Sequence, residues 1–161
     1  MARPNPVRAI MATPLPSITY QKRRGFRVGP EDVKYAYKIL NRYIFDNQLR
    51  CPNIDIGITR TYWGMCVGHS REQDSGSWCN LRISDKYFCV QWFMNTLAHE
   101  MAHQYQWDVI TPARLEQGME PVMSHGPTFF LWRERMLHYG VYLKTAHGQR
   151  RWFQHQDFNR C

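Results

Sequence analysis

Two histidines four residues apart in an apolar segment constrain this chain more than any other feature of its sequence. The segment from Leu97 to His103 reads Leu-Ala-His-Glu-Met-Ala-His, and apolar side chains recur around it at helical spacing. Residues four apart share one face of an α-helix, so His99 and His103 can both offer a ring nitrogen to one metal ion. A buried helix with two histidines and a glutamate needs a compensating partner, and a metal ion supplies one.

Glu100 lies beside the two histidines on the rim of the predicted helix. From there its carboxylate can reach a water molecule on the metal, which is the general-base geometry of zinc hydrolases. The expected cofactor is Zn²⁺, because imidazole nitrogens at about 2.0–2.1 Å suit it. A catalytic zinc usually has three protein ligands and one open position, so the pattern predicts a third ligand elsewhere in the chain.

The third ligand has several candidates in the sequence. An extended motif with glycine at 106 and histidine at 109 is excluded, because these positions hold Gln106 and Val109. Three downstream carboxylates are candidates: Glu116, Glu120 and Glu134. His125 is favoured over them, because it directly precedes a predicted helix start and its neighbour Gly126 permits close approach of the backbone.

The periodicity of the chain predicts an α+β fold. Helices are expected from Pro30 to about Phe45, at 90–107 and from 127 to just before Gly140, and strands at 54–58, 61–67 and 81–83. We expect the strands to form a small antiparallel sheet that precedes the metal helix. Residues 108–123 lack clear periodicity and contain two prolines and a glycine, which predicts a loop.

The net charge of +8 lies at the two ends of the chain. Residues 1–28 form a basic, proline-rich arm with six cations and no acid, and its prolines predict extended backbone. Residues 141–161 form a basic, aromatic tail, and residues 29–140 form the nearly neutral domain between them. Cations among aromatic side chains can contact nucleic acid, and the candidates are Lys22, Arg23, Arg24, Arg27, Arg150 and Arg151. The arm can alternatively contact a neighbouring chain or remain solvated.

Two features bear on the compartment. The longest uncharged run of interest, residues 87–99, has 13 residues, whereas a membrane-spanning helix needs about 20, so no membrane contact is expected. The five cysteines form no C-x-x-C pair, which favours free thiols in a reducing environment over a bridge such as Cys66–Cys79. The expected localisation is cytoplasmic, with association to a nucleoid or a virion as a further possibility.

Two motifs identify a resemblance. The first is L-x-H-E-M-x-H-x-x-Q-W from Leu97 to Trp107, and the second is S-H-G-P-x-F from Ser124 to Phe129. Together they resemble the SprT-like zinc metalloprotease family, which includes the Spartan proteases that digest proteins crosslinked to DNA. The resemblance covers about residues 31–138, and the metal motifs are its most specific part.

The resemblance implies a zincin-like SprT core with zinc on His99, His103 and His125. It implies that Glu100 is the catalytic base of a zinc-dependent endopeptidase, which cleaves protein substrates near or bound to DNA. The group that stabilises the oxyanion is left open among three candidates: Tyr62, His69 and Tyr105.

The sequence departs from the family at its end. Many members carry a zinc ribbon built on paired cysteines, and this chain has no C-x-x-C pair. An alternative function is therefore a zinc-containing structural or assembly protein, for example a phage particle component, whose basic arm contacts nucleic acid or neighbouring chains. A zinc hydrolase acting on a cell-wall peptide is a third reading.

Overall fold

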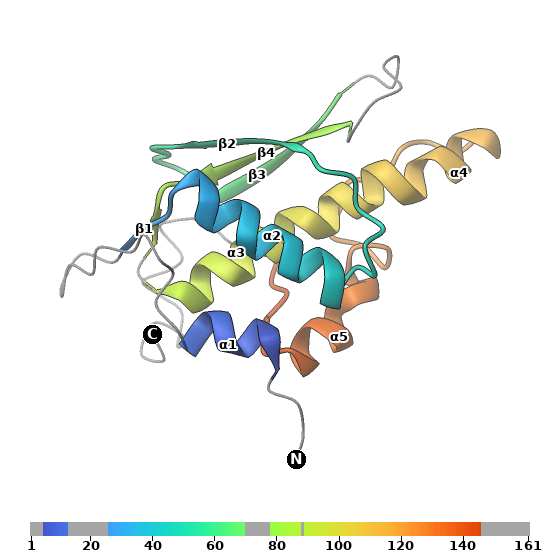
Figure 1. Ribbon diagram of the computed structural model, residues 1–161. Coiled ribbons are helices and arrows are strands. Elements are labelled where there is room, and N and C mark those ends of the chain that lie inside the picture. The colour runs from blue at the N-terminus through green and yellow to red at the C-terminus, as the bar shows by residue number, and fades with distance from the viewer. Residues whose placement is uncertain (1–4, 13–25, 70–77, 88, 146–161) are drawn as a thin grey trace.

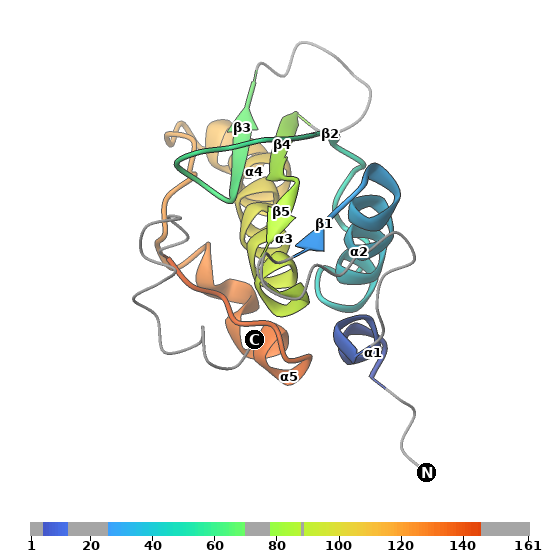
Figure 2. The same cartoon turned by 90° about the vertical axis from the view of Figure 1, so that its left-hand side faces the viewer.

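One helix, α3 (Val90–Tyr105), runs through the middle of the fold and carries both histidines of the motif (Figure 1). The computed structural model describes residues 5–12, 26–69, 78–87 and 89–145. Every residue of α3 from Trp92 to Gln104 is buried, so the helix is enclosed on all sides. The sheet lies on one side of α3, and α1 and α5 lie on the other (Figures 1 and 2).

The remaining helical elements surround α3. They are α1 (Pro6–Ala12), α2 (Pro30–Tyr43), a π-helical turn (Gln106–Ile110), α4 (Thr111–Glu116), a 3₁₀ turn (Phe130–Trp132) and α5 (Arg133–His138). The predicted start of α2 at Pro30 is confirmed, and the Asp32 carboxylate accepts a hydrogen bond from Gly29 N at 2.8 Å. The chain leaves α2 through Asp46 and Asn47, which both have positive φ.

The sheet is mixed, so the prediction of an antiparallel sheet is wrong in part. Its strands are β2 (Asn53–Gly57), β3 (Gly64–Gly68) and β4 (Cys79–Ser84), in the order β2-β4-β3. β4 pairs in parallel with β2 and antiparallel with β3, with Arg82 opposite Asp55 and Met65. Two short strands, β1 (Phe26–Arg27) and β5 (Lys86–Tyr87), form a separate antiparallel pair. The alternation of side chains indicates strands but carries no information on their order.

The N-terminal arm is not extended throughout, because residues 6–12 form α1. The Asn5 side chain accepts hydrogen bonds from the backbone N–H groups of Val7 and Arg8 at 3.0 and 3.1 Å. Pro6 takes the first helical position, where its missing N–H costs nothing. Val7 is fully buried, so this part of the arm belongs to the core.

The predicted loop at 108–123 is wrong in its first half, where the chain stays helical to Glu116. Pro112 lies in the first turn of α4, where a proline is tolerated. The helix ends at Gly118, which has a positive φ of 70°. The last predicted helix also differs, because regular structure begins only at Phe130, although it ends before Gly140 as expected.

The cysteines and the helices bear on the expected compartment. Cys51, Cys66 and Cys79 are free thiols, so a Cys66–Cys79 bridge is not formed. Cys89 is disulfide-bonded, which contradicts the expectation of free thiols at that position. Within the described ranges, no helix has the length and apolar character needed to cross a membrane.

β3 approaches α3 closely because it has glycine where it faces the helix. A Cβ placed on Gly64 would lie 2.8 Å from both Glu100 Cγ and Thr96 Cγ2, and one placed on Gly68 would lie 2.7 Å from the Trp107 ring. Real Cβ atoms essentially never approach other atoms so closely. The edge strand of the sheet is therefore held against the helix face that carries Glu100.

We predict that Gly64→Ala destabilises the protein by about 1–3 kcal/mol, because the added methyl group overpacks a rigid helix face. Gly57→Ala is the matched control in the same sheet, since nothing lies within 4 Å of its Cβ position. Urea unfolding of the two variants and the parent measures the difference. Equal stability of the Gly64 and Gly57 variants would show that β3 can move away from α3 at little cost.

Candidate metal centre

The structure brings His99, His103 and His125 together, as the sequence predicts. Their ligand nitrogens all lie within 4.8 Å of one another. His125 Nε2 is 3.2 Å from His99 Nε2 and 3.1 Å from His103 Nε2. His99 and His103 are buried on α3, whereas His125 is exposed in the segment that follows α4. The cluster is therefore open to solvent on the His125 side and can hold a metal ion.

The spacing of the three nitrogens fits a tetrahedral metal ion. Two imidazole nitrogens on one tetrahedral zinc lie about 3.3 Å apart when each bond is about 2.0–2.1 Å. The observed separations of 3.1 and 3.2 Å are close to that value. Burial lowers the pKa of His103 and of His125, which favours the neutral ring that binds metals. Three rings that point their nitrogens at one position are best satisfied by a cation there.

Hydrogen bonds at the far side of two rings fix which nitrogen faces the cluster. His99 Nδ1 donates to the backbone oxygen of Lys144 at 2.6 Å, and His103 Nδ1 donates to Gln106 Oε1 at 2.9 Å. A carbonyl oxygen can only accept, so Nδ1 carries the hydrogen in both rings. Nε2 is then left with its lone pair for a metal, as in other metal sites whose histidines are held from behind.

Gln106 joins the helix to the segment that carries His125. Besides accepting from His103, its amide nitrogen donates to Ser124 O and to Thr128 Oγ1, both at 2.8 Å. Its backbone oxygen accepts from Thr111 Oγ1 at 2.8 Å, across the π-helical turn. A fully buried amide with this set of partners fixes the distance between two ligands of the cluster.

An aromatic ring closes the inner side of the cluster. Phe129 is fully buried, and its ring centroid lies 4.8 Å from His99, 4.7 Å from His103 and 4.8 Å from His125. The three imidazoles therefore stand around one apolar ring. Such a wall keeps water away from the inner side and leaves the outer side for an exchangeable ligand.

Glu100 follows His99 on α3, and its side chain packs against the edge strand β3. Burial raises the pKa of its carboxyl group to about 8, and a hydrogen bond from the backbone N–H of Cys66 opposes part of that rise. The carboxyl group is thus held by β3, and none of the ion pairs found among the described residues includes it. In its ionised form, a carboxyl group with a raised pKa is a stronger base than an ordinary carboxylate.

The other candidate ligands and oxyanion groups lie apart from this cluster. Glu116, Glu120 and Glu134 are exposed and do not belong to it. The hydroxyl of Tyr105 donates to Gln48 Oε1 at 3.3 Å, and the His69 ring pairs with Asn80 Oδ1 at 3.3 Å. Tyr62 is half-buried, in the connection between β2 and β3. The geometry selects none of the three for the oxyanion.

The candidate nucleic-acid residues are mostly beyond the described ranges. These are Lys22, Arg23, Arg24, Arg150 and Arg151. Arg27 is described, and it lies in β1 with its guanidinium 2.6 Å from the Asp85 carboxylate. Its charge is therefore partly neutralised by the protein itself.

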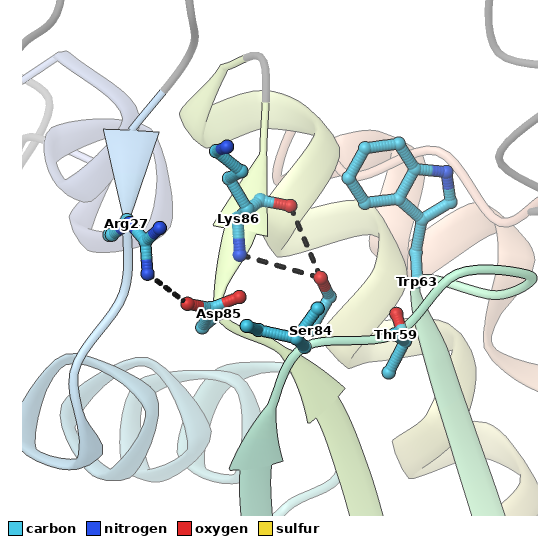
Figure 3. A pocket seen from close by; sticks show the side chains of 7 residues that line it. Arg27, Thr59, Trp63, Ser84, Asp85 and Lys86 are labelled. Atoms are coloured by element: carbon cyan, nitrogen blue, oxygen red, sulfur yellow. Dashed lines mark hydrogen bonds and ion pairs between the residues drawn. The ribbon is translucent and has the colours of Figure 1, made fainter.

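A pocket of about 190 Å³ lies beside β1 and β5 (Figure 3). Seven residues line it: Arg27, Ile58, Thr59, Trp63, Ser84, Asp85 and Lys86. Four of its polar side chains bond within the protein: Arg27 to Asp85, Ser84 to the backbone of Lys86, and Thr59 to the backbone of Tyr62. Because these groups already have partners, we assign the pocket no ligand.

No family model matches the chain, and no curated protein is similar to it in sequence. The resemblance to the SprT-like family is therefore carried by the two motifs, and the arrangement of the histidines is carried by the structure.

Two parts of the site are absent from the sequence prediction. Gln106 stands three residues after His103, and its place in the motif is a signal that could have been used. The Lys144 contact is made by a backbone carbonyl, so residue type gives no indication of it. A backbone carbonyl that hydrogen-bonds to a metal-ligating histidine can be identified only once the fold is known.

We predict that Gln106→Leu lowers zinc affinity about 10–100-fold, because His103 and the His125 segment both lose their anchor. Gln104→Leu is the matched control. Gln104 is equally buried, and its amide bonds to Tyr37, Arg50 and Asp108. Chelator competition measures zinc affinity, and thermal unfolding measures stability. If both variants lost the same affinity, Gln106 would act only through general stability.

Proposed function

We propose that this chain is a zinc-dependent endopeptidase of the SprT-like type, which cleaves proteins near or bound to DNA. The observation that carries the proposal is the convergence of His99, His103 and His125, with Glu100 directly after His99 on the same helix. A zinc ion held by three imidazoles supplies a Lewis acid and an activated water at neutral pH. The two sequence motifs support the assignment to this family, with its zincin-like core.

The role proposed for Glu100 is that of general base and then general acid. Its carboxyl group lies on the helix turn that carries His99 and His103, where it can take a proton from a water molecule at the cluster. Cys66 N–H holds the carboxyl group in place. A pKa raised by burial makes the group a better proton acceptor, and the same proton can then pass to the leaving amine.

A protein substrate is supported by the strand beside the site. β3 is an edge strand of the described sheet, and it runs along the face of α3 that carries Glu100. An edge strand can hold an extended polypeptide through backbone hydrogen bonds. The exposure of His125 leaves the cluster accessible to a long chain that enters from outside.

We predict that Glu100→Gln retains the fold and the zinc but loses about 10²–10⁴-fold in peptidase rate. The amide keeps the shape of the carboxyl group and removes the base. Cleavage of an unfolded protein by the zinc-loaded chain measures the rate, with and without single-stranded DNA. Glu116→Gln, on exposed surface away from the cluster, is the matched control and should keep full activity.

Two results would contradict this function. A Glu100→Gln variant as active as the parent would exclude the proposed base. A zinc-loaded parent that cleaves no protein under any of these conditions would favour the structural or assembly role, in which the metal only stabilises the fold.

The contact with DNA has a separate prediction. Replacing Lys22, Arg23 and Arg24 with glutamine should weaken DNA binding and lower its log–log salt slope by about 2–3, since each phosphate contact contributes roughly 0.7–0.9. These substitutions are preferable to deletion of residues 1–28, which would remove α1 and its buried Val7. A matched triple replacement of Lys34, Lys38 and Arg42 on α2 controls for net charge. Equal losses in both triple variants would exclude a specific role for the arm.

A further inference from the structure

The segment after α5 is bound along one face of the metal helix by three polar side chains of α3. Gln91 Nε2 donates to Gly140 O at 2.9 Å, and Asn95 Oδ1 accepts from the backbone N–H of Tyr142 at 2.9 Å. His99 Nδ1 donates to Lys144 O at 2.6 Å. We call residues 140–144 the strap. Its even-numbered residues bond to α3 through their backbone.

The odd-numbered residues of the strap bury their side chains. Val141 is fully buried and Leu143 is nearly so, whereas Tyr142 is exposed. The strap thus alternates like a β-strand, with α3 side chains in place of a neighbouring strand. Residues 91, 95 and 99 succeed one another at four-residue spacing, which puts them on one face of the helix. Gln91 Nε2 also donates to Asn95 Oδ1 at 2.8 Å, so the contacts of Gln91 and Asn95 with the strap are linked by a hydrogen bond.

His99 is the third of these contacts and also a ligand of the candidate metal cluster. Its two ring nitrogens face opposite ways, with Nε2 toward His125 and Nδ1 toward the strap. The position of the Lys144 carbonyl therefore decides both the tautomer and the tilt of the ring. Asn95 lies one helical turn from His99 and is almost completely buried. It holds the strap at Tyr142, two residues before the Lys144 carbonyl.

We propose that docking of the strap and metal binding are coupled through His99, with Asn95 and Gln91 as positioning residues that do not touch the metal. The inference rests on the proposed zinc site. A strap that is docked presents Nε2 of His99 correctly, and a bound metal in turn holds the ring that anchors the strap. Coupling of this kind is reciprocal, so each event must favour the other by the same factor.

The first experiment measures zinc affinity by chelator competition for the full chain. Asn95→Leu should bind zinc about 10-fold more weakly than the parent, since the loss of groups behind a ligand costs at least that much. Gln91→Leu, at a half-buried position one turn further away, should show a smaller loss of zinc affinity. It tests the same coupling if Asn95→Leu fails to fold. Val33→Ala, a core change in α2, is the control and should lower the melting temperature without changing zinc affinity.

The second experiment reads the coupling from the strap itself. Hydrogen exchange at the Tyr142 amide should slow on addition of zinc, by at least the factor that Asn95→Leu loses in affinity. Hydrogen exchange at Tyr142 that is unchanged by zinc would overturn the coupling and leave the zinc site intact. An unchanged zinc affinity in both the Asn95→Leu and the Gln91→Leu variants would do the same. A parent protein that binds no zinc would overturn the proposed function as well. The two failures are thereby separated.

Discussion

The burial of polar side chains on α3 is the constraint on which the rest of the structure depends. A helix enclosed on every side has no water for its polar groups, so a group without a partner in the protein or in an ion is costly. Six buried polar residues lie along α3: Asn95, Thr96, His99, Glu100, His103 and Gln104. Among them, the Thr96 hydroxyl has no hydrogen-bond partner in the described part of the chain. The neighbouring elements supply hydrogen-bond partners for the other side chains. The same helix therefore serves as the centre of the core and as the base of the candidate metal centre.

The partners of these residues come from separate parts of the chain. Cys66 N–H comes from β3, Gln106 from the π-helical turn, and the Lys144 carbonyl from the segment after α5. The unfolded chain has no such arrangement, so metal affinity depends on tertiary structure as much as on the three ligands. The π-helical turn has a clear place in this scheme, because Gln106 is its first residue and connects His103 to the segment of His125. Turns of this type often occur at functional sites.

The sequence predicts those features that depend on local spacing. The four-residue interval of His99 and His103, and the sequence Ser-His-Gly-Pro around His125, were enough to identify the three histidines that the structure brings together. The strand order was not predictable, because the alternation in β2, β3 and β4 is the same whichever strand lies in the middle. Pro6 and Pro112 led to wrong expectations for the same reason. Each stands at the start of a helix, where its missing N–H is harmless, and sequence alone gave more weight to its helix-breaking character.

The position of β4 between β2 and β3 has a consequence for the order of folding. Both of its partners precede it in the chain, and they do not pair with each other. During synthesis, β2 and β3 therefore have no partner until β4 has emerged from the ribosome. The β3–β4 pairing is the more local of the two contacts, and the parallel β2–β4 pairing closes a longer loop and should form later. Since α3 follows β4 within a few residues, the sheet and the helix that supports the histidines become available almost together.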